Sequence, residues 1–153
     1  MSSLRESLQE HPFFKGMSDE HIGRLEAVAR PVWAEPNDFV FRQGGAADCF
    51  LVLVQGDLAI ELHAGGRSAR IIHTVHAGEV VGWSWMHSPH RWMFDGRALN
   101  AVECLCLDGE AVRKLMEEDH EFGYQLLRRF SEPIVEELNA TRMQLLDVYG
   151  DSH

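Results

Sequence analysis

The sequence predicts a mainly β domain with helical segments at both ends. Between residues 33 and 107, short apolar runs alternate with turn residues at close intervals. Regularly spaced short strands of this kind are typical of a β-sandwich, barrel or jelly roll, not of a parallel βαβ sheet. Residues 1–32 and 108–150 instead repeat apolar positions at helical spacing. Because 153 residues suffice for one substantial core, we expect a single domain over residues 1–153.

The N-terminal segment is expected to form two helices. Leu4 and Leu8 share one helical face, and the sequence HPFFKG at 11–16 interrupts it. Ser18 is the expected N-cap of a second helix. The apolar positions of this second helix are Ile22, Leu25, Val28 and Ala29. Pro31 is expected to end it.

Seven strands are expected between the helical ends. They are residues 39–42, 49–55, 58–63, 70–75, 80–81, 93–100 and 102–107. The apolar run LVLV at 51–54 predicts a strand buried on both faces. Leu58, Ile60 and Leu62 alternate with polar neighbours, which predicts a half-exposed strand.

The C-terminal segment is expected to form a short helix and then a long one. Asp108 is a suitable N-cap for a helix over 109–117, and a longer segment begins at 118. Pro133 is expected to kink this long helix or mark its start. A heptad-like seam with spacings of four and three follows, and we expect homodimerisation through it. The predicted dimer interface is Ile134, Leu138, Thr141, Leu145 and Val148.

Composition and charge exclude several classes of partner. The apolar share of 45% and charged share of 25% are those of an ordinary globular protein. The formal net charge of -10 argues against direct DNA binding, because phosphate backbones are bound chiefly through clustered Lys and Arg. No apolar run is long enough to cross a bilayer and residues 1–10 are polar, so we expect a cytoplasmic protein without membrane attachment.

No catalytic residues and no metal ligands are expected, so we predict that the chain is not an enzyme. Cys49, Cys104 and Cys106 form no CxxC pair and are expected to be buried free thiols. His73 and His76 lie three positions apart, whereas two ligands on one face of a strand lie two apart. A cupin-like metal site is therefore not supported.

Residues 78–98 are the stretch most suited to binding a ligand. Gly82 can adopt backbone angles closed to other residues, and a turn after it can aim N–H groups at an anion. Arg91 can clamp a phosphate or carboxylate from the far end of the loop. Three of the four tryptophans fall here: Trp83, Trp85 and Trp92. They form either a stacking surface for a ligand or a plug of core side chains.

Four stretches together match the pattern of a known family. The sequence HPFFKGMS at 11–18 matches its helical lead-in, and FRQGGAADCFLVLVQGDL at 41–58 matches its signature hairpin. Residues 78–98 occupy the place of its phosphate-binding cassette, and ELNATR at 137–142 begins a segment like its dimer helix. The chain thus resembles cyclic nucleotide-binding domains of the Crp/Fnr type. The resemblance implies a β jelly roll, or double-stranded β-helix, flanked by N-terminal helices and a long C-terminal helix.

The resemblance also implies a ligand site. In this family the cassette and an arginine grip the cyclic phosphate, while a glutamate beside the cassette glycine binds the ribose hydroxyl. Gly82 matches that glycine and Arg91 is the candidate phosphate arginine. Trp83 stands at the glutamate position, and strict alignment places Trp92 at the arginine position. The candidate ligand-binding residues are Gly82, Trp83, Ser84, Trp85, Arg91, Trp92 and Arg97.

Two functions follow from these observations. The first is a regulatory or sensor module that binds a small anionic ligand, with cAMP or cGMP as candidates, and signals through its C-terminal dimer helix. The alternative is a degenerate domain whose pocket is plugged by tryptophan and which acts through dimerisation or a protein partner alone. The transcription factors of the family continue into a helix-turn-helix. Because this chain ends at His153, we expect a stand-alone domain without one.

Overall fold

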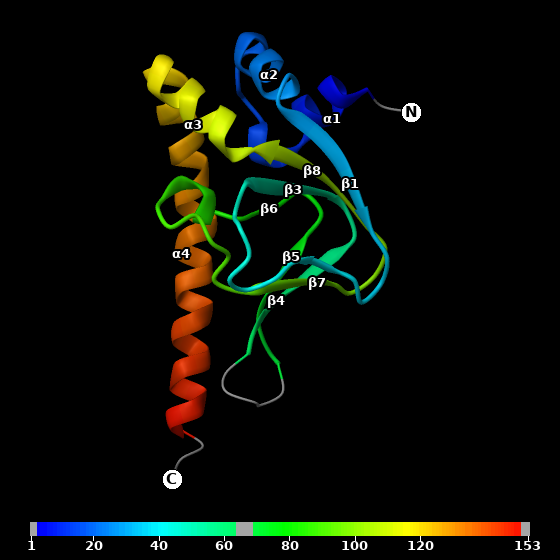
Figure 1. Ribbon diagram of the computed structural model, residues 1–153, viewed down its shortest axis with the longest axis vertical. Helices are drawn as coiled ribbons and strands as arrows, with labels where there is room; N and C mark the ends of the chain where they lie inside the picture. The colour runs from blue at the N-terminus through cyan, green and yellow to red at the C-terminus, as the bar shows by residue number, and fades with distance from the viewer. Residues whose placement is uncertain (1–2, 64–68, 151–153) are drawn as a thin grey trace.

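The structure is a computed structural model that describes residues 3–63 and 69–150, with side chains up to residue 147. Within these residues, helical elements flank eight strands (Figure 1). The helical elements are α1 (Leu4–Glu10), η1 (Pro12–Phe14), α2 (Asp19–Glu26), η2 (Ser84–Met86), α3 (Gly109–Glu118) and α4 (His120–Gly150). The strands are β1 (Ala29–Ala34), β2 (Phe39–Phe41), β3 (Cys49–Gln55), β4 (Asp57–Leu62), β5 (Arg70–His76), β6 (Val80–Val81), β7 (Asp95–Ala98) and β8 (Val102–Asp108).

The strands form two antiparallel sheets of four. The first sheet has the order β1-β8-β3-β6 and the second the order β2-β7-β4-β5. Successive strands cross from one sheet to the other several times, which is the topology of a jelly roll. The predicted fold class, a jelly roll flanked by N-terminal helices and a long C-terminal helix, is confirmed.

Two hydrophobic cores lie on opposite faces of the first sheet. The helical core, which includes Phe50 of β3, joins that sheet to the helices. The roll core, which includes Leu51 and Leu53, lies between the sheets. Because side chains alternate along a strand, β3 contributes to both cores. The prediction that residues 51–54 are buried on both faces is confirmed for 51–53, while Val54 is half-buried.

His11 ties the N-terminal segment to the roll. Its Nδ1 accepts a hydrogen bond from the backbone N–H of Phe13 at 3.2 Å, so its Nε2 carries the proton and donates to the carbonyl of Leu53 at 2.7 Å. Burial lowers the pKa of His11 below its ordinary value, and the bond to Leu53 offsets only part of this effect. The neutral imidazole therefore joins η1 to β3.

The prediction that the second helix runs to Pro31 is wrong. The helix α2 ends at Glu26, and residues 29–34 form β1 against β8. The predicted N-cap is confirmed, because Oγ of Ser18 accepts the N–H of His21 at 3.2 Å. Since β1 lies at the edge of the first sheet, Pro31 can occupy it without leaving a ladder bond unmade in the sheet interior.

The prediction of a half-exposed strand at 58–63 is also wrong. The strand β4 lies between β7 and β5, and residues 58–61 are all buried. Glu61 is only 4% exposed, and its carboxylate accepts two hydrogen bonds from Arg97, at 2.8 and 3.2 Å. A charged residue can be buried in this way when a partner of opposite charge is provided.

The C-terminal helices begin at aspartates. Oδ1 of Asp108 accepts the N–H of Ala111 at 3.1 Å, which confirms the predicted cap, and Oδ1 of Asp119 accepts the N–H of Phe122 at 3.1 Å. Pro133 lies inside α4 and does not mark its start. Among the described residues, no helix is both long enough and apolar enough to cross a membrane.

The buried imidazole of His11 predicts a dependence of stability on pH. The pKa of His11 in the folded state lies below its ordinary value of 6.5. At a pH between these two values, His11 is protonated in the unfolded chain and neutral in the folded chain. The stability that neutral His11 contributes to the folded state is fully present above pH 6.5 and is lost as the pH falls from 6.5 toward the folded-state pKa. We expect the unfolding free energy of the wild type, relative to His11→Gln, to fall between about pH 7 and about pH 5 by up to about 1.4 kcal/mol per pH unit. Urea titrations at several pH values measure this difference, and a difference independent of pH would contradict it.

Candidate functional site

The backbone at Gly82 is in direct contact with an indole ring. Gly82 has a φ of +98°, in the left-handed region that favours glycine, and a Cβ there would lie 2.7 Å from Cη2 of Trp92. The ring of Phe41 is stacked on this indole, with centroids 3.9 Å apart and an interplanar angle of 12°. Trp92 is therefore held between the start of the cassette and β2.

This packing leaves little empty space beside the cassette. Two cavities border Gly82 and Trp83, and each has a volume of only ≈ 20 Å³. Pockets that hold small molecules usually enclose about 300–1,000 Å³. Trp92 is 8% exposed and belongs to the roll core. In this conformation the indole occupies the space beside the cassette.

Four of the seven candidate ligand-binding residues lie together. Gly82, Trp83, Ser84 and Trp92 all line the second of these small cavities. Trp85 lies elsewhere, because it is fully buried in the helical core with its ring centroid 5.0 Å from that of Phe50. Trp85 thus serves as a core residue in this structure.

The two candidate arginines do not line either small cavity. Arg91 is exposed, and its Nη1 donates to the carbonyl of Gly44 at 2.8 Å. Arg97 is half-buried and donates to Glu61, and its Nη1 reaches Oδ1 of Asn37 at 2.9 Å. Arg97 is thereby engaged in an internal ion pair, whereas the guanidinium of Arg91 faces solvent.

Glu137 of α4 is part of the site, although sequence reasoning did not identify it. Nε1 of Trp83 donates a hydrogen bond to its carboxylate, and Glu137 lines both small cavities. Burial raises the pKa of Glu137, while the indole N–H and the nearby His73 oppose this shift. Its partner Trp83 lies 54 positions away, so the local sequence around Glu137 gave no signal of this contact.

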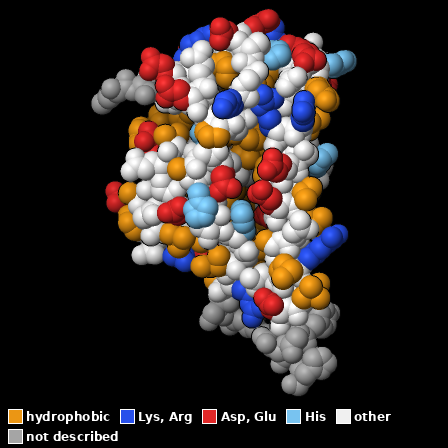
Figure 2. Space-filling view, turned by 180° about the vertical axis from the view of Figure 1, so that it is seen from behind, with side chains coloured by type: hydrophobic (Ala, Val, Ile, Leu, Met, Phe, Trp, Pro, Cys, Tyr) orange, Lys and Arg blue, Asp and Glu red, His pale blue; other side chains and the backbone are white. Residues whose placement is uncertain are grey.

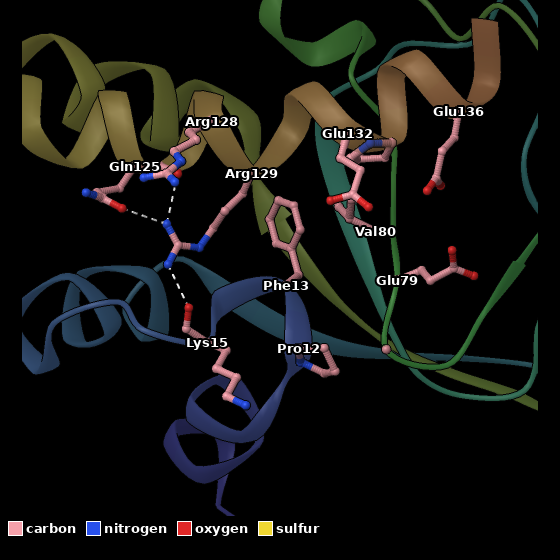
Figure 3. Close-up of a pocket in the computed structure, with 12 residues that line it drawn as sticks. Pro12, Phe13, Lys15, Glu79, Val80, Gln125, Arg128, Arg129, Glu132 and Glu136 are labelled. Carbon is pink, nitrogen blue, oxygen red and sulfur yellow. Dashed lines mark hydrogen bonds between the residues drawn. The ribbon is translucent and has the colours of Figure 1, made fainter. Parts of the chain in front are cut away.

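A groove of ≈ 580 Å³ separates α4 from η1 and from the loop before β6. One end carries Lys15, Arg128 and Arg129, and the other carries three carboxylates (Figure 3). The carboxylates belong to Glu79, Glu132 and Glu136. Arg129 donates to the carbonyl of Lys15 at 2.7 Å and to Oε1 of Gln125 at 2.9 Å. The bond to Lys15 joins the first half of α4 to the N-terminal segment.

The predicted dimer residues differ in exposure. Ile134 and Thr141 are half-buried, whereas Leu138 and Leu145 are 48% and 54% exposed. The side chain of Val148 lies outside the described residues. Further exposed apolar residues on α4 are Tyr124, Leu127, Val135, Met143 and Leu146. Hydrophobic side chains recur along the ridge formed by α4 in Figure 2.

The jelly roll, the segment between β6 and β7, and the long helix packed against the roll form the architecture that the sequence resemblance implied. A family model described as "Cyclic nucleotide-binding domain" matches residues 31–119. The chain belongs to the cyclic nucleotide-binding domain family, as the resemblance predicted. No curated protein matches the chain in sequence.

Solved structures share the fold. A protein of Geobacter metallireducens classed as cyclic nucleotide-binding is 20% identical, with a TM-score of 0.77, and the match covers 90% of this chain and 99% of that one. A cyclic nucleotide-binding domain from Methylobacillus flagellatus is 18% identical, with a TM-score of 0.73, covering 97% and 84%. The regulatory domain of Toxoplasma gondii PKA, solved with cAMP, is 18% identical, with a TM-score of 0.69, covering 84% and 49%.

The packing of Trp92 predicts a large cost for its removal. We expect Trp92→Ala to lower the unfolding free energy by about 3–5 kcal/mol, because the indole is buried and its loss leaves a cavity. Added indole should bind this cavity and restore part of the loss. The matched control is Trp33→Ala, since Trp33 is 67% exposed, and its effect should stay within about 0.5 kcal/mol. Denaturant titrations with and without indole measure these effects; equal losses in the two variants would refute the assignment.

Proposed function

We propose that this chain is a non-enzymatic regulatory domain whose own tryptophan fills the ligand site and whose output is the exposed face of α4. The observation that carries the proposal is the indole of Trp92, which stacks on Phe41 and leaves cavities of only ≈ 20 Å³ beside Gly82. A cyclic nucleotide needs a pocket more than ten times larger. In this state the position of α4 depends on contacts within the protein.

Contacts between α4 and three other parts of the domain support this role. The indole N–H of Trp83 binds the carboxylate of Glu137, and Arg129 binds the carbonyl of Lys15. Nε2 of Gln144 also donates to the carbonyl of Ile71 in β5, at 3.3 Å. Because α4 is attached at several points along its length, a change in the cassette would alter the surface that α4 presents.

The partner we propose for this surface is a second copy of the chain. Tyr124, Leu127, Ile134, Leu138 and Leu145 fit one heptad register, so two copies of α4 could pair along one seam. Leucines that are about half exposed on a helix are more stable when covered. The net charge of -10 favours a protein partner over direct contact with DNA.

A second candidate function is a sensor for a small anion such as cAMP or cGMP. The observation that favours it is Arg91, whose guanidinium is exposed and, within the described residues, has one hydrogen bond, to Gly44. Its remaining donors could receive a phosphate beside Gly82 and Ser84. A ligand of this kind would have to displace Trp92, the neighbour of Arg91 in the chain.

The dimer seam predicts the effect of a charge at its centre. We expect the wild type to be a dimer by size-exclusion chromatography with light scattering, and Leu138→Arg to be a monomer, because two buried guanidinium groups would face each other. Met143→Arg is the matched control, since Met143 is 60% exposed but lies off the seam, and it should leave the dimer intact. A monomeric wild type at concentrations well above micromolar would refute dimerisation through α4.

The filled site predicts the outcome of a nucleotide titration. Intrinsic tryptophan fluorescence should show no saturable change with cAMP, cGMP or cyclic dinucleotides, because the indole of Trp92 occupies the space that a ligand requires. A saturable change that is lost in Arg91→Ala, and kept in the control Arg128→Ala, would instead establish the sensor function. These variants remove one exposed guanidinium each, so general electrostatic effects cancel in the comparison.

A further inference from the structure

A larger cavity lies at the first sheet, and it shares Phe41 and Trp92 with the lining of one of the small cavities beside Gly82. Its volume is ≈ 600 Å³, and its lining comes from β1, β2, the start of β3 and the end of β8. Trp92 forms part of its wall. This volume lies within the usual range for sites that admit small molecules. Two of the three cysteines of the chain, Cys49 and Cys106, line this thiol cavity.

Strand register places these two thiols beside a cation. Cys106 of β8 lies opposite Arg30 of β1 and opposite Leu51 of β3. Cys49 lies two residues before Leu51 on the same strand, so its side chain points to the same face of the sheet. The first sheet therefore presents Arg30, Cys106 and Cys49 in neighbouring positions on the face that borders the cavity.

The surroundings favour a thiolate on Cys106. Hydrogen bonding with the Cys49 thiol lowers the pKa of Cys106 to about 7, with a smaller contribution from Arg30, while burial, Asp108 and Asp48 oppose the shift. The interaction with Cys106, together with burial, raises the pKa of Cys49, so Cys49 stays a thiol when Cys106 is a thiolate. Arg30 stands directly opposite Cys106, which identifies Cys106 as the nucleophile.

Cys104, the third cysteine, differs from Cys106 and Cys49 in its surroundings. It lies on the same face of β8 two residues from Cys106, yet it is not part of the lining of the thiol cavity. Its Sγ donates to the carbonyl of Val32 at 3.6 Å. Burial raises the pKa of Cys104 to about 12, which leaves it a thiol at neutral pH.

We propose that Cys106 and Cys49 form a redox-active pair that reacts with hydroperoxides entering the thiol cavity. The Cys106 thiolate attacks the terminal oxygen of the hydroperoxide, an S–O bond forms, the O–O bond breaks, and the leaving alkoxide takes a proton from solvent. Cys106 is now a sulfenic acid, oxidised by two electrons, and the hydroperoxide is reduced to an alcohol or water. The sulfur of Cys49 then attacks that of Cys106, and the hydroxide leaves with the thiol proton as water. The product is a disulfide.

Closing this disulfide requires a small movement. Diagonal neighbours on antiparallel strands have Cα atoms about 7–8 Å apart, whereas a disulfide usually spans about 4.4–6.8 Å. Cys49 is the first residue of β3, so the end of this strand can move toward β8. The chain just before it is bonded to the cassette, because the N–H of Ala47 donates to the carbonyl of His90 at 2.7 Å. Oxidation would thus move residues that adjoin Trp92.

The test is peptide mapping after exposure to hydrogen peroxide. Reduced protein is treated with one equivalent of hydrogen peroxide near neutral pH, the remaining thiols are alkylated, and peptides are analysed by mass spectrometry. We expect a peptide pair joined through Cys49 and Cys106, and in Cys49→Ser a dimedone adduct on Cys106. Cys104→Ser should react as the wild type does. Oxidation at Cys104 instead, or no thiol lost while free cysteine is consumed, would overturn the proposal.

The role of Arg30 gives a second readout that depends on pH. Near pH 7, iodoacetamide should label Cys106 about tenfold or more faster than Cys104. In Arg30→Met the labelling of Cys106 near pH 7 should slow by about threefold and recover at about pH 9 and above, because only the thiolate fraction changes. Circular dichroism verifies that the variant is folded. A rate in Arg30→Met equal to that of the wild type at every pH would show that the cation does not activate Cys106.

Discussion

The stacking of Trp92 between Phe41 and Gly82 is the contact on which the rest of the site depends. It requires a residue without a Cβ at 82, and Gly82 meets this requirement with its positive φ. The backbone around Trp92 is held as well, since its N–H donates to the carbonyl of Gly45 at 2.9 Å and its carbonyl accepts from Gly44 at 2.8 Å. A buried aromatic ring contributes several kcal/mol when its cavity is fully packed. The roll core therefore needs no ligand to be complete.

Contacts to two other segments of the chain hold α4 in place. The helix contacts the cassette through Glu137 and Trp83, and it contacts the N-terminal segment through Arg129 and the carbonyl of Lys15. The partly buried Glu137 keeps its hydrogen bond while its pKa is raised, so this contact combines a polar attraction with a cost of desolvation.

Local patterns in the sequence predicted local structure well. The strand at 49–55, the caps at Ser18 and Asp108 and the long C-terminal helix all depend on neighbouring residues, and all are confirmed. The errors involve partners that are distant in the sequence. The helical spacing of apolar residues through Val28 predicted a helix where β1 begins, because it does not register the pairing of β1 with β8. Glu61 is buried because Arg97, 36 positions away, neutralises its charge. The partnership of Trp83 with Glu137 spans 54 positions and has no local signal.

The contact between Gly82 and Trp92 also constrains how this domain can change over evolutionary time. Any side chain added at 82 collides with the ring at 92, whereas a smaller residue at 92 clears that space without help from 82. A side chain at 82 therefore requires that the indole at 92 has already been replaced by a smaller group. Related sequences should accordingly show a large aromatic residue at 92 only together with glycine at 82.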